Sequence, residues 1–104
     1  MMQYKIKIPN EANINYLKAL ISKVFKLLPM KEESIETANT YLESLLIELL
    51  GYKTLFDDNR NDHKIVSVIS TLNYLLHNDV SHKAYKREIF KCIKCIERLI
   101  EEAS

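Results

Sequence analysis

Hydrophobic residues recur at alternating steps of three and four along most of this chain, which is the period of an amphipathic α-helix. In the first such run, Ile14, Leu17, Ile21, Val24 and Leu28 share one face. Similar runs follow in three further segments. The pattern predicts four helices, over residues 10–28, 34–50, 63–77 and 81–102.

Turn-forming and capping residues set the expected ends of these helices. Pro29 is expected to end the first, because proline lacks an amide and disfavours helical backbone at the preceding residue. Gly51, the only glycine of the chain, stands where a left-handed C-terminal cap would end the second helix. Residues 57–62 are polar and predict a loop before the third helix. Residues 78 and 79 interrupt the helical pattern and predict a turn before the fourth helix.

The first nine residues have a different pattern. Tyr4, Ile6 and Ile8 alternate with Lys5 and Lys7, which predicts an extended arm over residues 1–9. The 104 residues, 47% of them hydrophobic, are enough for one domain with a core over residues 1–104. We therefore predict an all-α fold, an antiparallel up-down four-helix bundle with a short extended N-terminal arm.

Composition narrows the environment in which we expect the protein. The first residues lack the apolar centre of a secretory signal, and no apolar run reaches the roughly 20 residues of a membrane span. The two cysteines do not form a disulfide-rich framework. These features predict a cytoplasmic protein with no membrane partner, and the net charge of +1 gives the whole chain no electrostatic preference for nucleic acid.

Candidate catalytic and metal-binding groups do not form a convincing site. Cys92 and Cys95 have the spacing of a redox pair or half a zinc site, but both fall inside a predicted helix and no second cysteine pair exists. His77, Asp79 and His82 cluster at a turn without a rigid frame for a metal. We expect a protein that is not an enzyme, with no catalytic residue, no bound metal and no cofactor.

Two helix faces differ from an ordinary solvated surface. The third predicted helix has no charged residue from Ile65 to Leu76, and its outer face presents Ser67, Ser70 and Tyr74. A neutral face with a central aromatic side chain is typical of protein interfaces, although coverage by the arm or by residues 52–56 is an alternative explanation. The fourth helix carries a basic stripe with an aromatic neighbour, made of Lys83, Arg87, Phe90, Lys91, Lys94 and Arg98. Such a stripe fits an acidic protein surface, a phosphate backbone, or plain solvation.

These faces lead to a functional hypothesis. The predicted plan is similar to that of small bacterial four-helix proteins, including bacteriocin immunity proteins and phage-encoded accessory proteins, although this likeness is architectural and rests on no motif. We expect a non-enzymatic interaction module of this inhibitor or immunity type, forming a homodimer and binding a protein partner through both faces. The alternative is a small nucleic-acid-binding or regulatory protein that uses the basic stripe.

Overall fold

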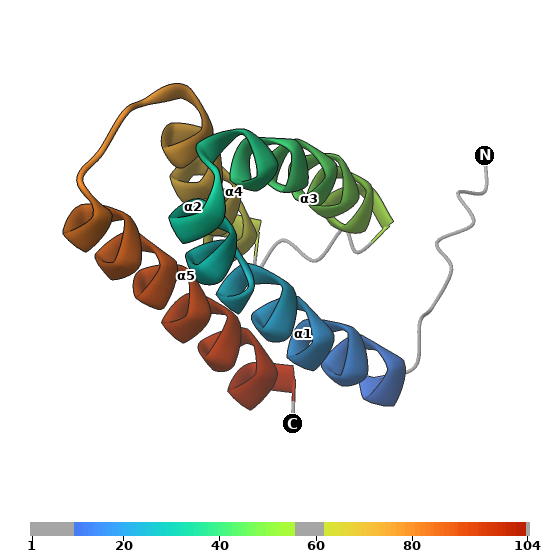
Figure 1. The fold of residues 1–104 in the computed structure, drawn as a ribbon. Helices are drawn as coiled ribbons and strands as arrows, with labels where there is room; N and C mark the ends of the chain where they lie inside the picture. Colours follow the sequence, from blue (N-terminus) through green and yellow to red (C-terminus); the bar gives the residue numbers. More distant parts are fainter. Residues whose placement is uncertain (1–9, 56–61, 104) are drawn as a thin grey trace.

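The computed structural model describes residues 10–55 and 62–103, and these residues form helices joined by short turns, with no strand among them. The helices are α1 (Asn10–Phe25), α2 (Leu27–Glu33), α3 (Ile35–Leu55), α4 (Asp62–His77) and α5 (His82–Ala103). In Figure 1 the first and last helices, α1 and α5, lie side by side. The predicted all-α class is confirmed. The predicted arm over residues 1–9 and most of the predicted loop, residues 57–61, lie outside the described residues.

Pro29 does not end the first helix where the sequence suggested. The helix breaks earlier, at Lys26, and Pro29 is the third residue of α2. The backbone stays nearly helical across the break, since the amide of Lys26 donates to the carbonyl of Ser22 at 3.1 Å and that of Met30 to Lys26 at 3.3 Å. The first turn of a helix has no acceptors for its own amides, so proline is tolerated there, but its ring crowds the carbonyl of Phe25 four residues earlier. The predicted end at Leu28 was wrong for this reason.

Gly51 does not cap a helix either. Helix α3 continues through it to Leu55, and Gly51 has no positive φ angle. The next residue, Tyr52, is buried, and its hydroxyl donates to Oδ1 of Asn13 on α1 at 2.7 Å. Burying a large aromatic side chain outweighs the cost of about 1 kcal/mol for a glycine inside a helix. The predicted end at Leu50 was therefore wrong.

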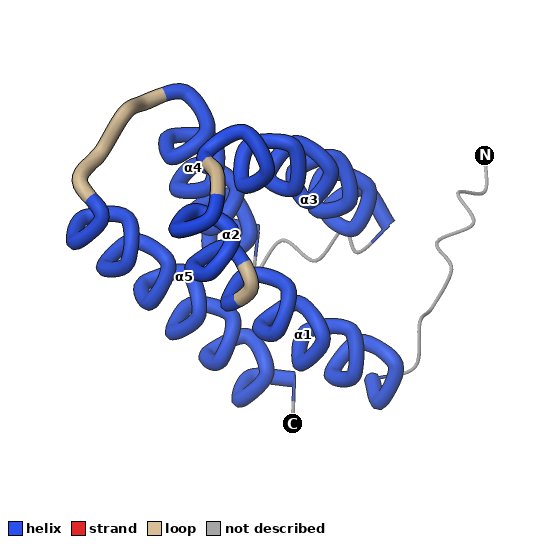
Figure 2. The backbone as a smooth tube through the Cα atoms, viewed as in Figure 1, coloured by secondary structure: helices blue, strands red, loops and turns tan. Residues whose placement is uncertain are grey.

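The ends of α4 and α5 lie within one residue of the predicted ones. Ser81 precedes α5, and its hydroxyl accepts a hydrogen bond from the amide of Ala84 at 3.1 Å, as expected of an N-terminal cap. Ser34 has the same role before α3, where it accepts from the amide of Thr37 at 3.4 Å. Figure 2 shows in tan the short loops that separate neighbouring helices. In the described ranges, every helix falls short of the length or the hydrophobicity that a membrane crossing requires.

The core draws side chains from all five helices. Helix α5 packs against both α1 and α4, α4 packs against α3, and the short α2 packs against α3. The largest fully buried side chains include Leu17, Leu20, Leu27, Leu42, Leu49, Leu72, Leu75, Tyr85, Ile89 and Ile96. Most of them lie on the faces that the helical period predicted. Two other large apolar side chains, those of Phe25 and Ile35, are each 47% exposed.

Candidate functional site

The neutral outer face of α4 is exposed along its length. Ser67 and Ser70 are exposed, and the side chain of Tyr74 is 49% exposed. Val66, beside them, is 42% exposed, so this face combines apolar and hydroxyl groups. The helix leaves these residues outside because Ile65, Val68, Leu72 and Leu75 take the opposite, buried face.

The basic stripe of α5 lies opposite the buried face of its helix. Its cations are all exposed, namely Lys83, Arg87, Lys91, Lys94 and Arg98. Three of these cations form no ion pair with any residue in the ranges 10–55 and 62–103, namely Lys83, Lys94 and Arg98. Three cations of this stripe are therefore available for a ligand of opposite charge.

A groove between α4 and α5 joins the two predicted faces. It has a volume of about 330 Å³. Ser70, Thr71 and Tyr74 of α4 line one wall, and Val80, Ala84, Arg87 and Glu88 line the other. The sequence placed Ser70, Tyr74 and Arg87 on two separate surfaces, whereas the packing of α4 on α5 brings them to one groove. We call this groove, together with the neighbouring Ser67 and Lys91, the α4/α5 surface.

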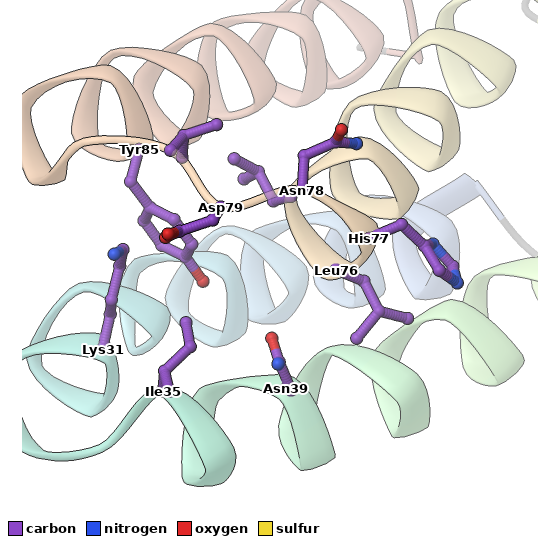
Figure 3. A pocket seen from close by; sticks show the side chains of 10 residues that line it. Lys31, Ile35, Asn39, Leu76, His77, Asn78, Asp79 and Tyr85 are labelled. Atoms are coloured by element: carbon purple, nitrogen blue, oxygen red, sulfur yellow. The ribbon is translucent and has the colours of Figure 1, made fainter.

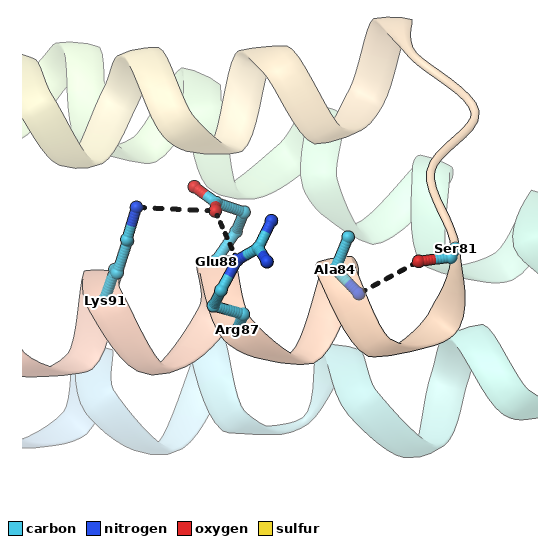
Figure 4. Close-up of polar contacts among 5 residues, drawn as sticks. All are labelled: Ser81, Ala84, Arg87, Glu88 and Lys91. Atoms are coloured by element: carbon cyan, nitrogen blue, oxygen red, sulfur yellow. Dashed lines mark hydrogen bonds and ion pairs between the residues drawn. The ribbon is translucent and has the colours of Figure 1, made fainter.

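Glu88 is the residue of this surface that the sequence did not indicate. Its side chain is 18% exposed and lies on the side of α5 that faces α4 (Figure 4). Its Oε2 atom is 3.4 Å from Nε of Arg87 and 3.6 Å from Nζ of Lys91. The carboxylate thus holds two cations beside the groove and neutralises part of their charge. The three-residue spacing to Lys91 was the available signal, because side chains at that spacing are neighbours on a helix.

Phe90 does not join this surface. Its ring makes an edge-to-face contact with Phe25 at the end of α1, with the ring centroids 5.7 Å apart and the planes at 87°. Both rings remain exposed, Phe90 to 38% and Phe25 to 47%. The structure therefore separates Phe90 from the α4 face and pairs it with the residue at which α1 ends.

A half-buried polar cluster joins α1 to α3. Glu48 of α3 accepts hydrogen bonds from the Tyr16 hydroxyl and the Lys23 ammonium of α1, each at 2.8 Å. Burial acts to raise the pKa of Glu48, but these two hydrogen bonds outweigh it and the pKa is lowered. Burial, reinforced by Glu48, raises the pKa of Tyr16. Because every one of these groups is engaged by another, we assign the cluster a structural role.

The two cysteines sit within α5 as free thiols, Cys92 buried and Cys95 half-buried. Burial raises the pKa of Cys92 to about 12, so at neutral pH the thiol stays protonated and is a poor nucleophile. His82 lies 3.2 Å from Glu32 on α2, and His77 is hydrogen-bonded to the carbonyl of Asn73. Within the described ranges, no three His, Cys, Asp or Glu side chains gather in an arrangement that would hold a metal ion.

Similarity to known proteins does not add to this description. No protein-family model matches the chain, and comparisons with curated proteins and with solved structures give no match either. Its function is therefore inferred from the geometry of its surfaces.

Proposed function

We propose that this chain is a non-enzymatic protein-interaction module, a small bacterial or phage accessory protein of the inhibitor or immunity type. It acts by binding proteins through the α4/α5 surface and the adjoining basic stripe of α5. The observation that carries the proposal is the groove that Tyr74 of α4 and Arg87 of α5 both line. Tyr and Arg are enriched at protein interfaces and among the residues that contribute most to binding.

The scaffold and the setting belong to the same proposal. We take the helices to form an antiparallel up-down bundle, with α2 as a short connecting helix, so that α4 and α5 present a rigid surface. Two free cysteines suit a reducing, cytoplasmic setting.

The proposed homodimer uses the neutral part of this surface. In a twofold dimer the same patch of each copy meets itself, so the cations of α5 would face like charges. The face of α4, with Ser67, Ser70 and Tyr74, carries no charge and has no such penalty. We therefore place the self-contact on α4, which leaves Lys83, Lys94 and Arg98 for an acidic surface on a target protein.

Light scattering coupled to size exclusion, across protein concentration and at two salt levels, tests the self-contact. Tyr74→Arg introduces a charge at the centre of the patch, and the dimer dissociation constant should rise about tenfold or more. Ile47→Arg is the matched control, since Ile47 is 72% exposed on α3, away from the groove. A mass that stays that of a monomer at every concentration, or an equal response to both substitutions, would refute the self-contact on α4.

A second candidate function is binding of nucleic acid along α5. It is favoured by the exposed Lys83, Lys94 and Arg98, which form no ion pair with described residues. Binding of this kind weakens steeply with salt, because cations on the protein release counterions from the phosphates. A gel-shift assay with duplex and single-stranded DNA at about 50 mM salt tests it, and the absence of any shift there would remove this candidate.

A further inference from the structure

A second cavity lies at the end of the molecule where α4 turns into α5, and it shares Val80 with the groove of the α4/α5 surface. Its volume is about 350 Å³, within the usual range of small-molecule sites. Residues of α2, α3, α4, the connecting turn and α5 line it, among them Lys31, Ile35, Asn39, Leu76, Val80 and Tyr85. Figure 3 shows Tyr85 reaching from α5 toward Asn39 on α3.

Two polar atoms in the wall of this cavity have no hydrogen-bond partner in the described protein. They are the hydroxyl of Tyr85 and Oδ1 of Asn39, each with less than 1 Å² exposed. The side chain of Tyr85 as a whole is 1% exposed. A buried polar group without a partner costs about 1–3 kcal/mol, so native proteins rarely keep two of them together without a purpose. One group donates and the other accepts.

The remaining lining defines what else would fit. Ile35, Leu75, Leu76 and Val80 give the cavity apolar walls. The ammonium of Lys31 lies 4.9 Å from the centre of the Tyr85 ring, and Asp79 lines the same cavity with the opposite charge. Because these two charges balance, the lining does not favour a charged ligand. Burial raises the pKa of Tyr85 to about 12, so its hydroxyl keeps its proton at neutral pH.

We propose that this cavity binds a small, uncharged, largely apolar molecule bearing a hydroxyl group. The ligand hydroxyl donates to Oδ1 of Asn39 and accepts from the hydroxyl of Tyr85, while its apolar part contacts the aliphatic walls. Ile35 controls access, because it lines the cavity on α3 one turn before Asn39 and its side chain is 47% exposed. Rotation of an exposed side chain of this kind is fast, so it does not limit entry of a ligand.

Phenol is a suitable probe, with benzene as the matched probe that lacks the hydroxyl. In a titration followed by ¹H–¹⁵N NMR, phenol should shift the amides of residues 76–80 with a Kd on the order of 1 mM, as expected for so small a ligand. Benzene should bind about 25-fold more weakly, because it lacks both neutral hydrogen bonds, each worth about fivefold.

Substitutions of Tyr85 and Asn39 test whether these two residues bind the phenol hydroxyl. Tyr85→Phe and, separately, Asn39→Leu should each weaken phenol binding about fivefold and leave benzene binding unchanged. Tyr41→Phe makes the same chemical change on α3 outside the cavity, and phenol binding should not respond. The second variant keeps the test decisive if Tyr85→Phe alters packing, which circular dichroism would reveal.

Three results would overturn the proposal. One is the absence of any amide chemical-shift change with phenol up to about 10 mM, tenfold above the expected Kd. In that case only water forms hydrogen bonds with the two polar atoms. Another is equal affinity for phenol and benzene. The third is phenol binding that persists unchanged in both Tyr85→Phe and Asn39→Leu.

Discussion

Two regions of this molecule bury tyrosine side chains, and they differ in whether the tyrosine hydroxyl has a hydrogen-bond partner. Between α1 and α3, the hydroxyl of Tyr16 donates to Glu48 at 2.8 Å and that of Tyr52 to Asn13 at 2.7 Å. The two rings stack on each other with their centroids 4.8 Å apart. At the far end of α3, the hydroxyl of Tyr85 is more deeply buried and has no partner among the described residues.

The difference separates a structural role from a binding role. The backbones of α1 and α3 do not pack closely, so long polar side chains span the gap and satisfy one another. Such a cluster stabilises the fold and leaves nothing for a ligand. The wall around Tyr85 and Asn39 has the opposite property, since the fold bears the cost of burying these groups without supplying their hydrogen bonds.

Removing Glu48 should have the largest effect on stability. Glu48→Ala takes away the acceptor of both Tyr16 and Lys23, and we expect the free energy of unfolding to fall by about 1–2 kcal/mol. The value is at the lower end for a charged group because Glu48 and Lys23 are each about a third exposed. Urea denaturation followed by circular dichroism measures it.

The control for this substitution is Glu43→Ala on the exposed side of α3. It makes the same chemical change without the two hydrogen bonds, and should alter stability by less than about 0.5 kcal/mol. Equal losses for Glu48→Ala and Glu43→Ala would contradict the structural role of the α1–α3 cluster.

The same substitution in the two regions should have effects of opposite sign. Tyr52→Phe removes a hydrogen-bonded hydroxyl and should lower the free energy of unfolding by about 1 kcal/mol. Tyr85→Phe removes a buried hydroxyl that has no protein partner, and should raise it by about 1 kcal/mol. Chemical denaturation of both variants beside the unmodified protein gives the two signs. Destabilisation by Tyr85→Phe would show that the Tyr85 hydroxyl has a hydrogen-bond partner. It would then not differ from the hydroxyls of Tyr16 and Tyr52.

Acid should weaken the α1–α3 cluster selectively, and this is the smallest effect. The folded-state pKa of Glu48 lies below its ordinary value of 4.5, so the folded protein binds this proton less readily than the unfolded chain does. The stabilisation is therefore complete above the unfolded pKa and is lost as the pH falls through the folded pKa. The stability difference between the unmodified protein and Glu48→Gln should shrink from pH 7 to about pH 3. A difference independent of pH would contradict this ionic contribution.

Local sequence signals predicted α4 and α5 well and the ends of α1 and α3 poorly. The start of α5 follows from Ser81, which caps the helix through its own hydroxyl. The end of α3 depends instead on Tyr52, whose burial and hydrogen bond to Asn13 involve another helix. A glycine at position 51 is a strong local stop signal, but such tertiary contacts override it.

For the candidate surface, sequence identified the exposed residues and the structure grouped them. Helical periodicity placed Ser67, Ser70 and Tyr74 on one outer face and the cations of α5 on another, and all of them are exposed. Which of them share a groove depends on how α4 packs on α5, and this excludes Phe90, which pairs with Phe25. Tyr85 is buried on the inner face of α5, and no sequence pattern indicates that its hydroxyl lacks a partner among the described residues.

By itself, the sequence determined the all-α class, the buried faces of the helices and the segments without charge. These depend on hydrophobic periodicity and capping, which act over one or two helical turns. Only the tertiary structure decided where α1 and α3 end, which exposed residues meet, and which buried hydroxyls have partners. Each of these depends on distances between helices far apart in the chain, and residue spacing along one helix does not contain that information.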